Sequence, residues 1–190
     1  MRLGDEQYEE IKRTVIDNFL EYGIKCIPIS AFEVATKMGI KVIPYSALSE
    51  NKRKASLKIS IDGYSMEDGN TGEWLIYYND SCQNYGRVNQ TIMHEIGHYA
   101  MGHIDDGDEE EAEAKFFAKY ALAPPPLVHT LLEKITPETI MRSFDISWEA
   151  ARNAYEYYKN WLYHGAHDYT DYEVKIINLF TENQKLMAYV

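Results

Sequence analysis

The sequence predicts an α+β fold, in which a small antiparallel or mixed sheet packs against a helix that carries the motif HExxH. Short runs of apolar and β-branched residues between 40 and 78 predict the strands. Segments with apolar residues at three- and four-residue spacing lie on both sides of these runs and predict helices. The motif, residues 94–98, lies in one such segment, and a glutamate-bearing helix and a C-terminal helical hairpin are expected after it.

The first part of the chain is predicted to form two helices and an edge strand. Apolar residues at helical spacing predict an amphipathic helix over about 5–22 that ends at Gly23. Ser30 and Glu33 have the spacing of a capping box, which predicts the start of a short helix. Residues 40–45 are rich in β-branched side chains but include a proline, which is typical of a strand at a sheet edge.

Two further strands are predicted before the motif. Leu57, Ile59 and Ile61 alternate with polar residues, which is the pattern of a half-buried strand. After a turn-rich stretch, 62–72, comes the run 74–78, which is apolar on both faces. We expect these two runs to pair antiparallel.

The second half of the chain is predicted to be mainly helical. A helix over about 87–102 carries the motif, and the next helix ends before the prolines at 124–126, which are expected to force an extended path. Thr136 and Ser147 precede two helices joined by a short connection, so these helices are expected to pack as a hairpin. Residues 174–180 fit either a strand or a helix.

Length and charge bound the organisation and the partners. The 190 residues predict a core over 1–135 with a helical region over 136–190 packed on it. The net charge of −11 opposes binding to nucleic acids and acidic membrane surfaces, and the basic run Lys52-Arg53-Lys54 fits a solvated turn. This charge also argues against a DNA-binding role for the hairpin.

The cysteines and the N-terminus predict a soluble, cytoplasmic protein. Cys26 and Cys82 are far apart and lack CxxC spacing, so they are expected to be reduced thiols. The N-terminal residues lack the apolar core of a signal peptide, and no apolar run approaches 18 residues.

The motif His94-Glu95-Ile96-Gly97-His98 predicts a metal site. Positions i and i+4 lie on one face of a helix, so both imidazoles can reach one metal ion from the same side. Glu95 points about a quarter turn away, where it is poorly placed to bind the metal but well placed to accept a proton from an activated water. These are the central residues of a zinc hydrolase; the alternative is a surface helix with two histidines.

A catalytic zinc site needs a third protein ligand. The candidates are His103, Asp105, Asp106, Asp108 and the acidic cluster that ends at Glu113. His103 would lie on the wrong side of the helix unless the helix breaks at Gly102. Glu111 is favoured because it begins a helical stripe of small residues, Ala114, Ala118 and Ala121, that would let the two helices approach closely. Glu113 is the main rival, and Glu111 also fits an ordinary capping box with Asp108.

These residues resemble the ImmA/IrrE family of bacterial metallopeptidases, and the resemblance covers most of the chain. The matching segments are Pro28, Gly39-Ile40-Lys41-Val42, Ile76-Tyr77-Tyr78-Asn79, Arg87, Thr91, the HExxH motif, Gly102-His103, residues 111–118, Leu122, Pro124, and Phe144-Asp145-Ile146-Ser147 with Ala150-Ala151. Three positions depart from the pattern: Gln90, Ala123, and Lys115, which stands where Asn or Asp is usual.

The resemblance implies a zincin-like, gluzincin-type endopeptidase with zinc held by His94, His98 and Glu111 and with Glu95 as general base. Manganese or iron could take the place of zinc. The implied substrate is a helix-turn-helix repressor of a phage, mobile element or stress-response system, whose cleavage relieves repression. The alternatives are a regulatory protein that sequesters its repressor without cutting it, and a DNA-binding regulator that uses residues 137–163.

Two features of the expected reaction stay open in the sequence. Tyr77, Tyr78 and His164 are candidates for stabilising the oxyanion. The strand over 74–78 could pair with an extended substrate segment, or it could be an ordinary core strand.

Overall fold

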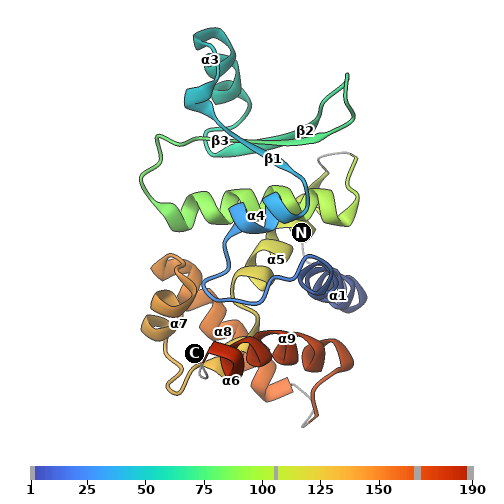
Figure 1. The fold of residues 1–190 in the computed structure, drawn as a ribbon, viewed down its shortest axis with the longest axis vertical. Coiled ribbons are helices and arrows are strands. Elements are labelled where there is room, and N and C mark those ends of the chain that lie inside the picture. Colours follow the sequence, from blue (N-terminus) through green and yellow to red (C-terminus); the bar gives the residue numbers. More distant parts are fainter. Residues whose placement is uncertain (1–2, 105–106, 165–167, 188–190) are drawn as a thin grey trace.

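The chain folds into a small sheet stacked on layers of helices, with the sheet near one end of the molecule (Figure 1). The structure, a computed structural model, describes residues 3–104, 107–164 and 168–187, with side chains up to residue 182. The elements are α1 (Asp5–Glu21), α2 (Ala31–Lys37), β1 (Lys41–Pro44), the 3-10 helix η1 (Tyr45–Ala47), α3 (Glu50–Ile59), β2 (Gly63–Glu67), β3 (Trp74–Tyr78), α4 (Tyr85–Met101), α5 (Asp108–Leu122), α6 (Pro125–Leu131), α7 (Pro137–Phe144), α8 (Trp148–His164) and α9 (Asp171–Met187). The predicted α+β class is confirmed.

The sheet is mixed and has the strand order β1-β3-β2. β1 runs parallel to β3, with Val42 opposite Ile76, and β2 runs antiparallel to β3, with Ser65 opposite Ile76. The edge position predicted for the first strand is confirmed. The short helix before that strand is confirmed as well, since the Ser30 side chain accepts a hydrogen bond from the amide of Glu33.

The strand predicted over residues 57–61 is wrong. Residues 50–59 form helix α3, and Leu57, Ile59 and Ile61 are all exposed. The partner of β3 is instead β2, which lies in the stretch predicted as turns. The alternation of apolar residues favoured a strand over 57–61, but an exposed helix needs no apolar stripe and can carry apolar residues at this spacing. The glycine that begins β2 is typical of a turn, so it favoured a turn where the strand lies.

Gly63 is a glycine because β2 lies very close to its neighbours. A Cβ atom there would stand 2.7 Å from Thr91 Cγ2 and 2.8 Å from the carbonyl oxygen of Tyr77. We therefore expect Gly63→Ala to reduce the free energy of unfolding by about 1–3 kcal/mol, measured by urea denaturation. Gly69→Ala is the matched control, because a Cβ at Gly69 meets no atom within 4 Å. Equal stability of the two variants would contradict this account of β2.

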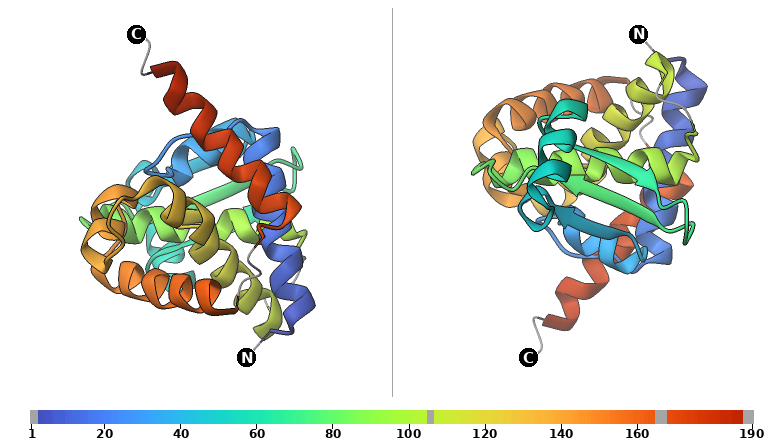
Figure 2. Two further views of the ribbon diagram at one scale, coloured as in Figure 1. Left: turned by 90° about the horizontal axis from the view of Figure 1, so that it is seen from below. Right: turned by 90° about the horizontal axis from the view of Figure 1, so that it is seen from above.

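Helix α4 lies beneath the sheet and is contacted from several sides (Figures 1 and 2). It packs against β2 and β3 above and against α1, α2 and α5 elsewhere. Ile92, Met93 and Ile96 are fully buried in these contacts. Because the motif residues lie on the same helix, their backbone is held by the core of the molecule.

Helices α4 and α5 pack closely against each other. A Cβ at Gly97 would stand 3.1 Å from Phe117 Cβ and 3.2 Å from Ala114 Cα, so the glycine permits this approach. Ala114 and Ala118, the small residues noted on α5, are buried. The predicted close approach of the two helices is therefore present.

The C-terminal half differs from the prediction at one point. Residues 124–126 do not force an extended path throughout, because Pro124 caps helix α6 and Pro125 is its first residue. A proline at the start of a helix removes an amide that would have no helical partner. The α7–α8 hairpin is confirmed, with Asp145 in a left-handed conformation between the helices. The segment 174–180 lies in helix α9, which packs against α1 and α6 (Figure 2, left).

Candidate metal centre

Three potential metal ligands converge between α4 and α5. His94 Nε2 and His98 Nε2 are 3.2 Å apart, and Glu111 Oε1 lies 3.6 Å from the first and 3.4 Å from the second. One ligand atom from each residue lies within 4.8 Å of the others. Two imidazole nitrogens and a carboxylate oxygen are a donor set that suits a catalytic zinc ion.

The local sequence explains how the three side chains meet. The histidines are one turn apart on α4, so their rings project from the same face. Glu111 lies in the first turn of α5, and α5 can come close enough because Gly97 has no side chain. Glu111 therefore lies close to both histidines although it belongs to the next helix.

Glu111 carries a second contact on its other oxygen. Lys115 Nζ lies 2.9 Å from Glu111 Oε2, which leaves Oε1 directed at the histidines. Burial raises the pKa of Glu111, but the hydrogen bond and the charge of Lys115 outweigh burial and hold the pKa below its usual value. The carboxylate is therefore ionised at neutral pH. Lys115, which departs from the family pattern, thus contacts the carboxylate of Glu111.

His94 is neutral at physiological pH. Burial and then the proximity of His98 lower the pKa of His94 from its usual 6.5 to about 4. A neutral imidazole offers a lone pair to a metal ion without first losing a proton.

This lowered pKa predicts that the metal-free protein loses stability in acid. The unfolded chain binds a proton at His94 near pH 6.5 and the folded chain only near pH 4, so protonation favours unfolding. We expect about 3 kcal/mol to be lost as the pH falls from 6.5 to 4, measured by urea denaturation in the presence of a chelator. His94→Gln is the control and should show a smaller loss over the same interval. A variant with an undiminished loss would contradict this assignment.

Glu95 lies beside the three converging residues but is not one of them. Its side chain is buried, and its Oε2 accepts a hydrogen bond of 2.7 Å from Ser65 Oγ of β2. Ser65 was not predicted as a site residue, because β2 itself was read as part of a turn. The hydrogen bond joins the sheet to the motif helix directly at this carboxylate.

The remaining candidate ligands lie elsewhere. Helix α4 ends at Gly102, whose φ is 71°, and His103 then folds back so that its Nδ1 lies 3.0 Å from His98 Nδ1. Glu113 Oε2 lies 2.9 Å from His103 Nε2, so Glu113 is behind the metal centre. Asp108 is exposed at the start of α5, and Asp105 and Asp106 fall outside the described residues.

A cleft with a volume of about 630 Å³ opens onto the three converging residues. The residues that line it besides His94, Glu95, His98 and Glu111 come from the end of α3, the loop before β2, β2, α4 and α5. They include Ser60, Gly63, Tyr64, Ser65, Arg87, Gln90, Thr91 and Lys115. The site is therefore open to a molecule that approaches between the sheet and α5.

The three predicted oxyanion residues do not line this cleft. The ring of Tyr77 stacks on Tyr64, and the ring of Tyr78 packs on Phe32. His164 lines a separate hollow near α9. Among the tyrosines of the described residues, Tyr64 lines the cleft, and sequence reasoning missed it because it belongs to β2.

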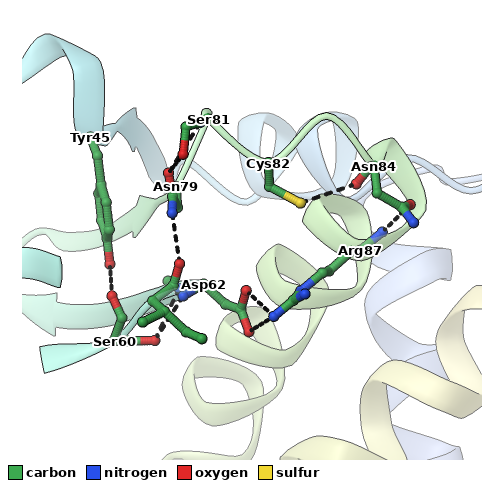
Figure 3. Close-up of polar contacts among 10 residues, drawn as sticks. Tyr45, Ser60, Asp62, Asn79, Ser81, Cys82, Asn84 and Arg87 are labelled. Atoms are coloured by element: carbon green, nitrogen blue, oxygen red, sulfur yellow. Dashed lines mark hydrogen bonds and ion pairs between the residues drawn. The ribbon is translucent and has the colours of Figure 1, made fainter.

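Polar contacts fix the loop before β2 against the motif helix (Figure 3). Arg87, near the start of α4, pairs with Asp62 at 2.7 Å. Asn79, which follows β3, donates from Nδ2 to the carbonyl oxygen of Ile61 and from its amide to that of Asp62. Arg87 and Asn79, both noted in the family pattern, thus hold in place the loop before β2, which lines the cleft.

The fold and the site together define a metallopeptidase: a helix bearing HExxH lies under a small sheet, and a glutamate of the next helix lies near both histidines. The chain belongs to the peptidase family described as the IrrE N-terminal-like domain, whose model matches residues 35–156. The resemblance stated from the sequence is therefore confirmed. No curated protein matches the chain. Within the described residues, no helix has the length and apolar character needed to cross a membrane.

Proposed function

We propose that the protein is a zinc-dependent endopeptidase, in which His94, His98 and Glu111 hold the zinc ion and Glu95 is the general base. The observation that carries the proposal is the convergence of three donor atoms beside a buried carboxylate that points into the same cleft. Bound there, zinc would polarise the scissile carbonyl and activate a water molecule. Manganese or iron would suit the same donor set.

In this mechanism the protein's own residues bind and move protons. Glu95 takes the proton of the attacking water and later delivers it to the leaving amine. Ser65 holds Glu95 from the sheet side, which limits the rotation of the carboxylate. Tyr64 borders the cleft, but its hydroxyl lies 3.0 Å from Ser56 Oγ of α3, on the sheet face opposite to Ser65, so it is not placed to contact the scissile carbonyl.

The substrate would bind as an extended segment along β2. The earlier candidate, the strand over 74–78, is β3, and it has a neighbouring strand on both sides. Within the described residues β2 ends the sheet on the side of the cleft, and Gly63, Tyr64 and Ser65 line that cleft. An extended segment added to this edge would run past the metal centre.

The proposed substrate rests on the family resemblance. We propose that it is a helix-turn-helix repressor that is cut once, which releases transcription. The reaction would take place in the cytoplasm, and the repressor would belong to a phage, a mobile element or a stress-response system. The net charge of −11 supports a protein substrate rather than direct binding to DNA.

The test is incubation of the zinc-loaded protein with a helix-turn-helix repressor encoded beside its gene. We expect one cut, found by mass spectrometry, and release of the repressor from its operator DNA. A repressor that stays intact but bound would favour the sequestering function instead. Salt-sensitive binding of the protein to the operator itself would favour a DNA-binding function.

A further inference from the structure

A chain of buried and partly buried polar side chains lies behind His98, on the side away from the converging donor atoms. His98 Nδ1 is 3.0 Å from His103 Nδ1, and His103 Nε2 is 2.9 Å from Glu113 Oε2. The exposed fractions of the three side chains are 6%, 7% and 15%. Such burial distinguishes these contacts from ordinary surface hydrogen bonds.

We propose that His103 and Glu113 are positioning residues that fix the tautomer and the orientation of His98, so that its Nε2 is presented to the metal. This inference rests on the proposed function, because it assigns His98 as a metal ligand. It gives separate roles to Glu111 and Glu113. The carboxylate of Glu111 faces Nε2 of His98, whereas that of Glu113 contacts His103, which in turn contacts Nδ1 of His98.

The end of α4 brings His103 into this position. Gly102 adopts a left-handed conformation, which reverses the chain at the end of the helix. The amide of His103 then donates to the carbonyl oxygen of His98 at 3.0 Å, which holds the two residues side by side. Their rings meet edge to face, with centroids 5.1 Å apart and an interplanar angle of 74°.

The carboxylate sets the direction of the hydrogen bonds. An ionised carboxylate only accepts, so His103 Nε2 must carry a hydrogen and donate it to Glu113. In a neutral ring the other nitrogen, His103 Nδ1, is then an acceptor, and His98 Nδ1 must donate to it. The remaining nitrogen, His98 Nε2, keeps its lone pair and points toward Glu111 and His94. One acid at the end of the chain thus selects the tautomer of His98 that can bind a metal.

Helix α1 holds the carboxylate from its other side. Gln7 Nε2 donates to Glu113 Oε1 at 3.1 Å and also to Glu109. The orientation of the Gln7 amide is itself fixed, because its Oε1 accepts a hydrogen bond of 2.8 Å from the amide of Gly4. The support of His98 therefore extends from the motif helix through α5 to the first turn of α1.

Removal of either His103 or Glu113 should weaken zinc binding. Zinc affinity is measured by competition with a chromophoric chelator on the wild type, His103→Ala and Glu113→Ala. We expect each variant to bind zinc about 10- to 100-fold more weakly, the usual effect of losing a hydrogen bond to a metal-binding histidine. Glu113→Gln, whose amide oxygen can still accept from His103, should lose less. Glu109→Gln is the matched control, since Glu109 also accepts from Gln7 but does not contact His103.

A second measurement separates positioning from simple destabilisation. In the zinc-loaded wild type labelled with ¹⁵N-histidine, NMR should show His98 protonated on Nδ1 and metal-bound on Nε2, and the weaker variants should lose this protonation pattern. Urea denaturation of the metal-free forms checks that each variant is folded before zinc is added.

The outcomes distinguish this inference from the proposed function. If wild type binds zinc and cleaves, but His103→Ala and Glu113→Ala match its zinc affinity within twofold, the positioning role is wrong and the peptidase stands. An equal loss in Glu109→Gln would also overturn it. If the wild type itself binds no zinc, both the peptidase and the positioning role fail.

Discussion

Glu95→Gln is expected to abolish peptide cleavage while the protein retains its zinc. Glutamine has the shape of glutamate and can still accept the hydrogen bond from Ser65, so the buried site keeps its packing. It cannot accept a proton from the attacking water, and general base catalysis contributes about 100- to 10,000-fold to such reactions. The measurement is the rate of cleavage of the repressor, together with zinc content by plasma mass spectrometry.

Retention of zinc by this variant is as important as the loss of activity. Glu95 is not among the residues whose donor atoms converge, so its replacement should leave the metal affinity within a few fold of the wild type. The control is Glu138→Gln, an exposed glutamate of α7 that does not line the cleft. A Glu95→Gln protein that cleaves at the wild-type rate would remove Glu95 from the mechanism, and one that is metal-free would make it a ligand.

The helices could be predicted from the sequence because their signals are local. Helical spacing, caps and a terminal glycine all act within a few residues, and they located α1, α2, α4 and the α7–α8 hairpin. β2 could not be found in this way, because its first residue is a glycine selected by the closeness of Thr91 and Tyr77, which are remote in sequence. The exposed apolar residues that alternate at the end of α3 instead led to a predicted strand that the structure does not contain.

The site residues, like the helices and strands, could be predicted where their arrangement depends on local sequence and not where it depends on contacts between remote residues. The relation between His94, Glu95 and His98 is set by one turn of helix, so the motif alone predicted which side chains share a face. Glu111 needed a second inference, from the small residues that let α5 approach α4. Ser65 and the pairing of His103 with Glu113 depend on contacts between separate elements, and no spacing in the sequence indicates them.

Glu111→Ala is expected to remove the metal and the activity together. The substitution deletes the only acidic member of the converging group in the described residues. It also leaves the charge of Lys115, which now pairs with Glu111, to oppose a divalent cation beside the two histidines. We expect the zinc affinity to fall by more than the roughly 10- to 100-fold that follows loss of an outer hydrogen bond, measured by chelator competition.

Comparison with Glu113→Ala decides between the two glutamates, since both lie on α5 and differ in what they face. Replacement of Glu111, the proposed zinc ligand, should lower the zinc affinity more than replacement of Glu113, which is proposed to support His98. Glu110→Ala, from the same first turns of α5, controls for the loss of a negative charge near the site. If Glu113→Ala lost zinc completely while Glu111→Ala kept it, the carboxylate behind His98 would have to turn toward the metal in the loaded protein. The arrangement of donors proposed for the centre would then be wrong.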